Sequence, residues 1–215
     1  MITLKKVKIA LTKGRLEKEA IEIFKTININ TRELEDKGRK LILNCENEEY
    51  NIDFFLVKAK DVETYVEYGA ADMGIVGKDT LMEANKEFYE VLDLNVGKCK
   101  FALAALPSFK LDQGYNRKKI ATKYPNIARE YFRKKGMDVE LIKIEGSVEL
   151  GPIVGLADAI VDIVETGNTL RENGLVVVED ICEISARMIV NKASMKTKKD
   201  EIIKIIENVS EVIKQ

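Results

Sequence analysis

The chain has 215 residues, of which 46% are hydrophobic and 33% charged, a composition typical of a folded globular protein rather than a disordered one. Its 35 Lys and Arg residues against 36 Asp and Glu residues give a formal net charge of -1. This balance argues against a nucleic-acid partner but leaves room for a local anion site. The chain has no histidine, which excludes a His base, a His-containing triad and a His metal ligand.

The three cysteines, Cys45, Cys99 and Cys182, lie far apart and form no CxxC pair. Dispersed cysteines in odd number are typical of a reduced protein in which they act as small buried hydrophobes, so we expect a cytoplasmic location. The start of the chain shows no leader-like pattern, and the apolar run 101–106 is far shorter than the roughly 20 residues of a membrane helix. We therefore expect no membrane partner.

Short β-branched runs alternate with amphipathic helical patterns in the first half of the chain, which predicts an α/β fold. The strands expected there span residues 7–11, 41–45, 52–57, 72–76, 91–95 and 98–106. The expected helices span residues 16–24, 61–69 and 80–85, the second of them capped by Asp61 and closed by Gly69. The polar stretch 46–51 separates two strands and predicts a hairpin, so mixed sheets are expected.

A second α/β series follows the loop-like stretch 107–116. Its expected strands span residues 120–122, 139–144, 159–164, 175–178 and 186–190, and its expected helices span 126–135 and 202–213. Two such series predict two lobes, one formed by residues 1–94 plus 178–215 and the other by residues 95–177. A seam between lobes commonly forms a ligand-binding cleft at the carboxyl ends of parallel strands.

The segment 157–170 is the most informative, because a strand there runs into a small polar turn and then a helix start. The turn offers hydroxyl groups and approachable backbone N–H groups that can bind a phosphate. Its members are Glu165, Thr166, Gly167, Asn168 and Thr169. The alternative is an ordinary strand–turn–helix in which Thr166 is only an N-cap.

Two aspartates, Asp158 and Asp162, alternate with apolar residues on this strand and therefore share one of its faces. Carboxylates beside a phosphate-binding turn suit ribose hydroxyls or a Mg²⁺ ion.

Further strand-to-helix joins carry residues that could bind anions. The candidate residues at these joins, including a glycine whose backbone a phosphate can approach closely, are Lys13, Gly14, Arg15, Lys58, Lys78, Lys123, Glu145, Ser147 and Glu149. Solvated charged turns and ordinary helix caps are the alternatives for these joins. Tyr124 could stack on a base or be a core residue.

Five segments together resemble the ATP phosphoribosyltransferase family. They read IALTKGRL (9–16), DVETYVEYGAADMGIVGK (61–78), ATKYPN (121–126), GSVELGPIVGLADAIVDIVETGNTL (146–170) and EISARMIVN (183–191). The resemblance spans nearly the whole chain, with Thr12 standing where the family usually has proline. The chain has no room for the C-terminal regulatory domain of the long form, so it resembles the short form.

The resemblance implies a two-lobed fold like that of type II periplasmic binding proteins, with a cleft between the lobes. It also implies a homo-oligomer that assembles with a regulatory subunit resembling histidyl-tRNA synthetase. The implied reaction begins histidine biosynthesis. It joins N1 of the adenine of ATP to C1 of the ribose of phosphoribosyl pyrophosphate (PRPP), and it requires Mg²⁺. Pyrophosphate leaves with inversion, and the product is N1-(5-phosphoribosyl)-ATP.

By the same resemblance, the turn 165–169 should bind the 5-phosphate of PRPP. Asp162 and Asp158 should face the ribose hydroxyls or the metal. Asp162 and Arg15 are the expected catalytic residues, and Arg15 with Lys13 should bind pyrophosphate or the phosphates of ATP. Weaker candidates for the same role are Lys58, Lys78 and Lys123. The ATP and pyrophosphate subsite should also include Gly14 and the second loop, which is lined by Glu145, Ser147 and Glu149.

Three other functions compete with this interpretation. A two-lobed anion-binding module would bind the same ligands without turnover. A Rossmann-like phosphoribosyltransferase acting on a free base usually has two adjacent acidic residues before its turn, whereas here Ile163 follows Asp162. A non-catalytic subunit is the third, and the intact Lys13, Arg15 and Thr169 argue against it.

Overall fold

The computed structural model describes residues 4–84, 86, 88–112 and 117–214, and the chain divides into two compact units. Unit 1 consists of Met1–Leu81, Lys86–Gly97 and Ser185–Gln215, and unit 2 of Met82–Asn85 and Lys98–Ile184. The chain thus changes unit at 81/82, 85/86, 97/98 and 184/185, whereas the expected lobe boundaries lay near 94 and 177.

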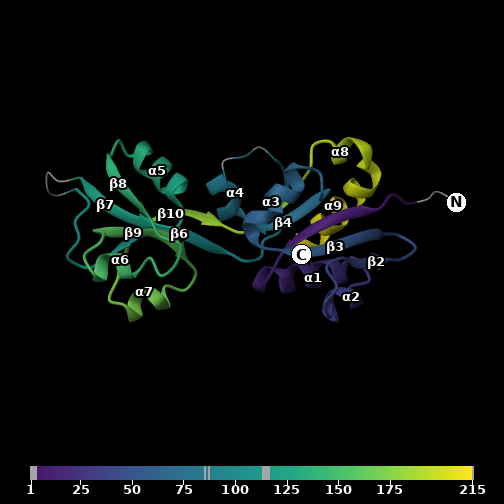
Figure 1. Cartoon of the computed structure of the whole chain (residues 1–215), viewed down its shortest axis with the longest axis horizontal. Coiled ribbons are helices and arrows are strands. Elements are labelled where there is room, and N and C mark those ends of the chain that lie inside the picture. Colours follow the sequence, from purple (N-terminus) through teal and green to yellow (C-terminus); the bar gives the residue numbers. More distant parts are fainter. Residues whose placement is uncertain (1–3, 85, 87, 113–116, 215) are drawn as a thin grey trace. The chain divides into compact units, whose positions relative to one another are not determined.

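Unit 1 is built on a six-stranded mixed sheet of order β2-β3-β1-β4-β11-β5 (Figure 1). Its strands are β1 (Val7–Thr12), β2 (Leu43–Glu46), β3 (Asn51–Val57), β4 (Met73–Gly77), β5 (Tyr89–Asp93) and β11 (Ala186–Val190). β3, β1 and β4 run parallel, while β2, β11 and β5 each pair antiparallel with a neighbour. The β2–β3 pairing confirms the expected hairpin.

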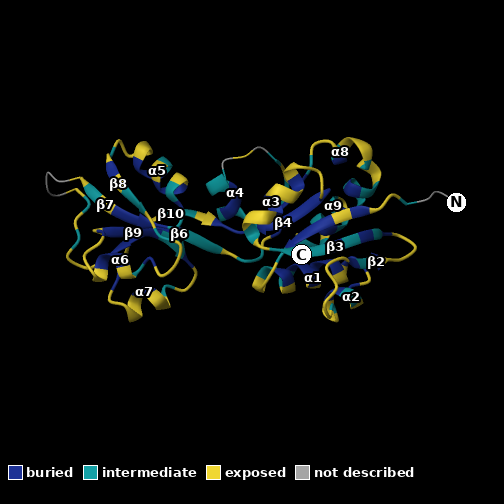
Figure 2. Cartoon of the chain, in the orientation of Figure 1, coloured by how far each residue is buried: buried dark blue, intermediate teal, exposed yellow. Residues whose placement is uncertain are grey.

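The helices of unit 1 cover both faces of this sheet. They are α1 (Arg15–Thr26), α2 (Arg32–Glu35), α3 (Ala59–Glu67), the start of α4 (Lys78–Ala84), α8 (Ser194–Thr197) and α9 (Lys199–Ile213). Apolar residues of α1, α2 and α9 join one buried cluster, and those of α3 join another. Of the strands between them, β1, β4 and β11 are largely buried, whereas most of β3 is partly buried and β5 has no buried residue (Figure 2).

Unit 2 has a five-stranded mixed sheet of order β10-β6-β9-β7-β8. Its strands are β6 (Cys99–Ala105), β7 (Lys118–Thr122), β8 (Val139–Lys143), β9 (Ala159–Val164) and β10 (Val176–Ile184). β8, β7 and β9 are parallel, so their carboxyl ends meet at the same edge of the sheet. β6 and β10 continue the sheet in antiparallel pairs.

Three helices complete unit 2, α5 (Pro125–Lys134), α6 (Leu150–Ile153) and α7 (Asn168–Glu172). Ile127, Ala128 and Phe132 of α5 belong to the cluster on one face of the sheet, and Leu170 of α7 belongs to the cluster on the other. In Figure 1, α5 lies on one side of the unit 2 sheet and α6 and α7 on the opposite side.

Two sequence expectations about element boundaries are corrected. β10 extends to Ile184, whereas the expected strand covered only 175–178. The prediction was too short because two bulges shift the register of β10 and interrupt its period-two alternation. This continuous strand pairs with β6, which is why residues 178–184 belong to unit 2. α3 begins at Ala59 with Lys58 as its N-cap, so Asp61 lies in the first turn and is not the cap.

Cys45, Cys99 and Cys182 form no disulfide bond; Cys45 is buried, and Cys99 and Cys182 are partly buried. In the part of the chain that the structure describes, no helix is long and apolar enough to cross a membrane.

Candidate functional site

The predicted residues of unit 2 gather at the edge where its parallel strands end. In the register of the sheet, Thr122 of β7 lies beside Lys143 of β8 and Val161 of β9. The joins that follow these strands carry the predicted residues Lys123, 145–149 and 165–169. The structure therefore brings these predicted joins to one edge of unit 2.

The join after β9 turns sharply at Gly167, whose φ of 71° is left-handed and favours glycine. A Cβ atom there would lie 3.3 Å from the Arg171 side chain. The Asn168 N–H donates to Thr166 Oγ1 at 3.4 Å, and the side chains of Thr166 and Thr169 are exposed. α7 has only five residues, so this turn offers local amides and hydroxyls rather than the dipole of a long helix.

Asp162, near the carboxyl end of β9, has a strongly shifted pKa. It is half-buried on β9, and burial is the main cause that raises the pKa of its carboxyl group to about 6. The Ile163 backbone N–H and the Lys123 ammonium lower this pKa, whereas the Glu149 carboxylate raises it. Charged groups from two neighbouring joins thus act on one carboxyl group.

Asp158 does not belong to this edge, which corrects the expectation that it lies beside the phosphate-binding turn. It immediately precedes β9, so the six residues of the strand, about 20 Å, separate it from the turn. Its Oδ2 accepts the Lys119 N–H at 2.7 Å, and its own N–H donates to Lys119 O at 2.8 Å. Both bonds tie the amino ends of β7 and β9 together, so Asp158 has a structural role.

The join after β8 is held by Val148, which is buried in the core of unit 2. Glu149 is half-buried and precedes the four-residue helix α6. Ser147 is exposed, and its carbonyl oxygen accepts the Leu150 N–H at 3.1 Å. Glu145 forms an ion pair with Lys143 at 2.9 Å. Glu149 is the member of this join that acts electrostatically on Asp162.

Unit 1 has a comparable edge, where its parallel strands β1, β3 and β4 end and the predicted cations follow. Gly14 has a φ of 105° and a ψ of -138°, a conformation that residues with a Cβ rarely adopt. Its N–H donates to Glu17 Oε2 at 3.2 Å, and the Lys13 N–H donates to Val57 O at 2.9 Å. These bonds fix the backbone of this join, while the side chains of Lys13 and Arg15 are exposed.

Lys58 and Lys78 differ in their surroundings. Lys58 is exposed at the start of α3. Lys78 Nζ lies 2.5 Å from Glu90 Oε2, and Glu90 Oε1 lies 3.0 Å from Arg187 Nε, which belongs to a side chain that also pairs with Asp93. The charge of Lys78 is therefore largely offset. Arg187 and Glu90 were not predicted as site residues, because their sequence signal is only a charged residue next to apolar residues in a strand.

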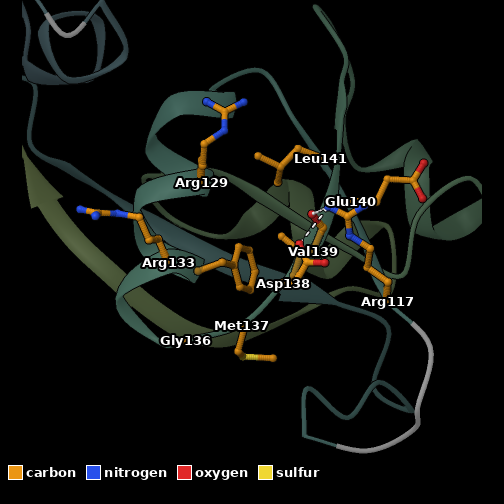
Figure 3. Close-up of a pocket in the computed structure, with 10 residues that line it drawn as sticks. Arg117, Arg129, Arg133, Gly136, Met137, Asp138, Val139, Glu140 and Leu141 are labelled. Atoms are coloured by element: carbon orange, nitrogen blue, oxygen red, sulfur yellow. Dashed lines mark hydrogen bonds and ion pairs between the residues drawn. The ribbon is translucent and has the colours of Figure 1, made fainter.

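A hollow of about 700 Å³ in unit 2 contains none of the predicted site residues (Figure 3). It lies beside the carboxyl end of α5 and the start of β8, at the amino ends of the parallel strands. In the close-up, Arg117 reaches Asp138 across the start of β8, with the ion pair at 2.9 Å. The predicted residues therefore lie at the carboxyl ends of the parallel strands, away from this hollow.

Comparisons with known proteins establish the family. The family model described as HisG, ATP phosphoribosyltransferase, matches residues 58–211. The ATP phosphoribosyltransferase of Clostridium botulinum (strain ATCC 19397 / Type A) is 96% identical over 212 residues, which cover 99% of this chain and 100% of the relative. The chain belongs to the ATP phosphoribosyltransferase family. A second family member, from Clostridium novyi (strain NT), is 76% identical over 98% of this chain and 99% of its own length.

Solved structures agree with this assignment. The ATP phosphoribosyl transferase (HisG:HisZ) complex from Thermotoga maritima matches with a TM-score of 0.80 and 35% identity, over 96% of this chain and 97% of that chain. A putative L-cystine ABC transporter protein from Listeria monocytogenes matches with a TM-score of 0.57 at 14% identity, over 98% of this chain and 90% of that one. The latter likeness concerns the fold alone and confirms the expected periplasmic-binding-protein-like class.

Membership of the ATP phosphoribosyltransferase family confirms the expected activity, the first step of histidine biosynthesis. It replaces the competing interpretations of a binding module, a free-base transferase and a non-catalytic subunit. Among the described residues, no group of three or more Cys, Asp or Glu is arranged to hold a metal ion.

Proposed function

We propose that the unit 2 edge binds PRPP and that the unit 1 edge binds the phosphates of ATP or the departing pyrophosphate. The observation that carries this assignment is the difference between the two edges. The unit 2 edge combines exposed hydroxyls and turn amides with the half-buried carboxyl of Asp162, whereas the unit 1 edge carries the exposed cations Lys13, Arg15 and Lys58.

At the unit 2 edge, the turn 165–169 binds the 5-phosphate through its backbone amides and through the hydroxyls of Thr166 and Thr169. Asp162 then faces the ribose. As pyrophosphate leaves C1, the ribose gains positive charge, and a carboxylate held in partly desolvated surroundings stabilises that charge. The adenine N1 lone pair attacks C1 from the side opposite to the leaving group, which gives inversion. Asp158 takes no part, because it lies at the other end of β9.

At the unit 1 edge, Lys13 and Arg15 bind phosphate oxygens beside the closely approachable backbone of Gly14. Arg15 can present two parallel N–H donors to one phosphate, which a lysine cannot. Lys58 adds a third exposed cation. Lys78 is a weaker ligand, because Glu90 already offsets its charge at 2.5 Å.

Mg²⁺ fits this arrangement as an ion carried mainly by substrate. Mg²⁺ in protein sites commonly uses one or two carboxylates together with substrate phosphates and water. Asp162 would supply a carboxylate, and among the described residues no group of three or more Cys, Asp or Glu side chains is arranged to hold a metal ion. Bound Mg²⁺ would neutralise the pyrophosphate as it leaves, while Asp162 orients the ribose.

We also propose that the chain works in the cytoplasm, as a homo-oligomer assembled with a regulatory subunit. Support for the subunit comes from the Thermotoga maritima HisG:HisZ complex, whose matched chain has nearly the same extent as this one, with 96% and 97% coverage. Activity assays should therefore be made with and without such a subunit.

The first test is a calorimetric titration of the purified chain with Mg²⁺ and PRPP, followed by ATP. Binding of both substrates is expected. Thr169→Val should weaken PRPP binding about tenfold or more, because one hydrogen bond to a charged group is worth roughly 1.5–3 kcal/mol.

Thr26→Val is the matched control, since Thr26 is an exposed helical threonine in unit 1 whose hydroxyl donates only to the Glu22 carbonyl at 2.9 Å. It should leave PRPP binding unchanged. If Thr169→Val binds PRPP as tightly as wild type, the turn 165–169 does not bind the 5-phosphate. If the wild-type chain binds PRPP but not ATP, the assignment of the unit 1 edge to ATP phosphates is wrong.

A further inference from the structure

The turn 13–15, which carries the exposed side chains of Lys13 and Arg15, is closed by a carboxylate in the first turn of α1. Glu17 Oε2 accepts the Gly14 N–H at 3.2 Å. Gly14 is the N-cap of α1 and has no side chain with which to cap the helix. The bond from Glu17 therefore fixes how the chain enters α1.

Gly14 needs this bond because its conformation is one of many that a glycine can adopt. Its φ of 105° and ψ of -138° lie outside the regions that other residues prefer. Just before it, the Lys13 N–H donates to Val57 O at 2.9 Å, at the end of β3. The two bonds hold the turn from opposite sides, so the spacing between the Lys13 and Arg15 side chains depends on both of them.

A buried carboxylate beside a turn that binds phosphate has a cost, because it repels phosphate and is itself desolvated. Glu17 is only 9% exposed, and a buried charge requires a partner of opposite sign. Lys37, in the loop between α2 and β2, donates its ammonium group to Glu17 Oε1. Since Lys37 lies 20 residues farther along the chain, a separate segment of unit 1 offsets this negative charge.

We propose that Glu17 is a positioning residue for the unit 1 edge. It holds the backbone of Gly14 so that the side chains of Lys13 and Arg15 bind one polyphosphate together. Lys37 offsets the charge of Glu17, which would otherwise repel that polyphosphate. This role rests on the proposed function of the unit 1 edge. Glu17 acts through the backbone of Gly14, and Lys37 acts through Glu17.

The first part of the test needs no ligand. Hydrogen exchange of the Gly14 amide is followed by NMR in wild type, Glu17→Ala and Glu17→Gln. Exchange should be about tenfold faster in Glu17→Ala, because the Gly14 N–H loses its acceptor. Glu17→Gln keeps an oxygen at the same reach, so its exchange should stay close to that of wild type. If Glu17→Ala does not fold, Glu17→Asp, shorter by one methylene, takes its place.

The second part measures binding of Mg²⁺–ATP and of pyrophosphate by calorimetric titration. For the polyphosphate that occupies the unit 1 edge, Glu17→Ala should weaken binding about fivefold to tenfold. Glu17→Gln should bind it at least as tightly as wild type, because the acceptor oxygen stays and a negative charge is lost. Lys37→Met should weaken binding about threefold, and adding Glu17→Gln to Lys37→Met should restore it.

Salt separates the two roles. The loss in Lys37→Met comes from charge, so it should shrink at about 0.5 M salt, where surface charges are screened. The loss in Glu17→Ala comes from the geometry of the turn and should persist at the same salt concentration.

Two control variants remove comparable ion pairs away from the turn. Glu22→Ala removes an exposed carboxylate of α1 that pairs with Lys25 at 2.9 Å. Lys6→Met removes a lysine that pairs at 3.1 Å with the largely buried carboxylate of Asp53. Both should leave polyphosphate binding unchanged. Ribose 5-phosphate, a ligand for the unit 2 edge, should bind equally well to every variant.

Unchanged Gly14 exchange in Glu17→Ala would overturn the proposal, as would polyphosphate binding that is as weak in Glu17→Gln as in Glu17→Ala. If the wild-type chain binds neither polyphosphate, the assignment of the unit 1 edge is wrong. That result differs from failure of the positioning role, because Gly14 exchange without ligand still shows whether Glu17 holds the turn.

Discussion

The two units place polar joins at the ends of three parallel strands, yet the joins carry different chemistry. In unit 1 the side chains after β1 and β3 are exposed cations, of which Arg15 lies 3.8 Å from a Glu19 carboxylate oxygen, and the lysine after β4 lies closer to its carboxylate partner, at 2.5 Å. In unit 2 one half-buried carboxyl is influenced by a single lysine and a single glutamate. The same topology thus gives one edge suited to polyphosphate charge and another suited to a ribose phosphate whose C1 becomes positive.

The largest effect expected from this comparison concerns Asp162. Asp162→Asn keeps the shape of the side chain but removes the negative charge that stabilises the ribose in the transition state. We expect turnover with saturating PRPP and ATP to fall about 100-fold. Steady-state kinetics with the regulatory subunit present would measure it. Wild-type turnover in this variant would mean that the two edges do not divide the chemistry as proposed.

A smaller effect separates two cations of unit 1. Arg15→Ala should lower kcat/KM about tenfold, because it removes a charged donor from phosphate. Lys78→Ala should lower it only about threefold, because Glu90 lies 2.5 Å from the lysine ammonium, whereas the Glu19 carboxylate lies 3.8 Å from Arg15. Measuring kcat/KM for ATP and for PRPP in both variants tests the ranking. Equal losses of kcat/KM in the two variants would show that ion pairing does not determine how much each cation contributes to substrate binding.

The pH dependence of stability gives a third test. The folded-state pKa of Asp162 is about 6 against 3.8 for the ordinary group, so the folded chain holds this proton more tightly than the unfolded chain does. Stability therefore falls as pH rises from about 4 to 6 and is level above that. In wild type this decrease in the free energy of unfolding should amount to about 1 kcal/mol after allowance for solvent screening. Asp162→Asn should not show it.

Denaturant unfolding of both proteins at pH 4, 5, 6 and 7 measures this difference. Parallel pH profiles for wild type and Asp162→Asn would show that burial does not perturb this carboxyl.

The smallest effect is expected at the other end of β9. Asp158→Asn keeps an oxygen that can accept the Lys119 N–H, so the free energy of unfolding should drop by no more than about 1 kcal/mol. PRPP affinity should not change. Calorimetric titration measures the affinity and denaturant unfolding the stability. Weakened PRPP binding would return Asp158 to the site and remove the contrast between the two ends of the strand.

Much of the fold was predictable because local patterns decide it. The expected strand 159–164 is β9 to the residue, and the polar turn after it follows from Gly167 and its hydroxyl neighbours. The joins at the strand ends could also be predicted, since parallel strands must end at a common edge. What local patterns supply is the identity of the elements and the residues that follow them.

The remainder depends on contacts between residues far apart in the chain. β10 was recognised only in part, because its two bulges interrupt the alternation on which strand prediction rests. The partners of Asp158 and Lys78, and the pairing of Lys37 with Glu17, join segments 12 to 39 residues apart. Sequence spacing can propose that such side chains are polar and exposed, but it cannot show which of them are already paired.

The position of β11 sets the order in which the protein can be completed during synthesis. This strand lies between β4 and β5, so the unit 1 sheet remains interrupted until residues 186–190 have been translated. Residues 98–184 of unit 2 are continuous and leave the ribosome before that strand does. Unit 2 can therefore fold during translation. Until β11 is added, the unit 1 sheet has an unpaired strand edge that a chaperone or a neighbouring nascent chain can bind.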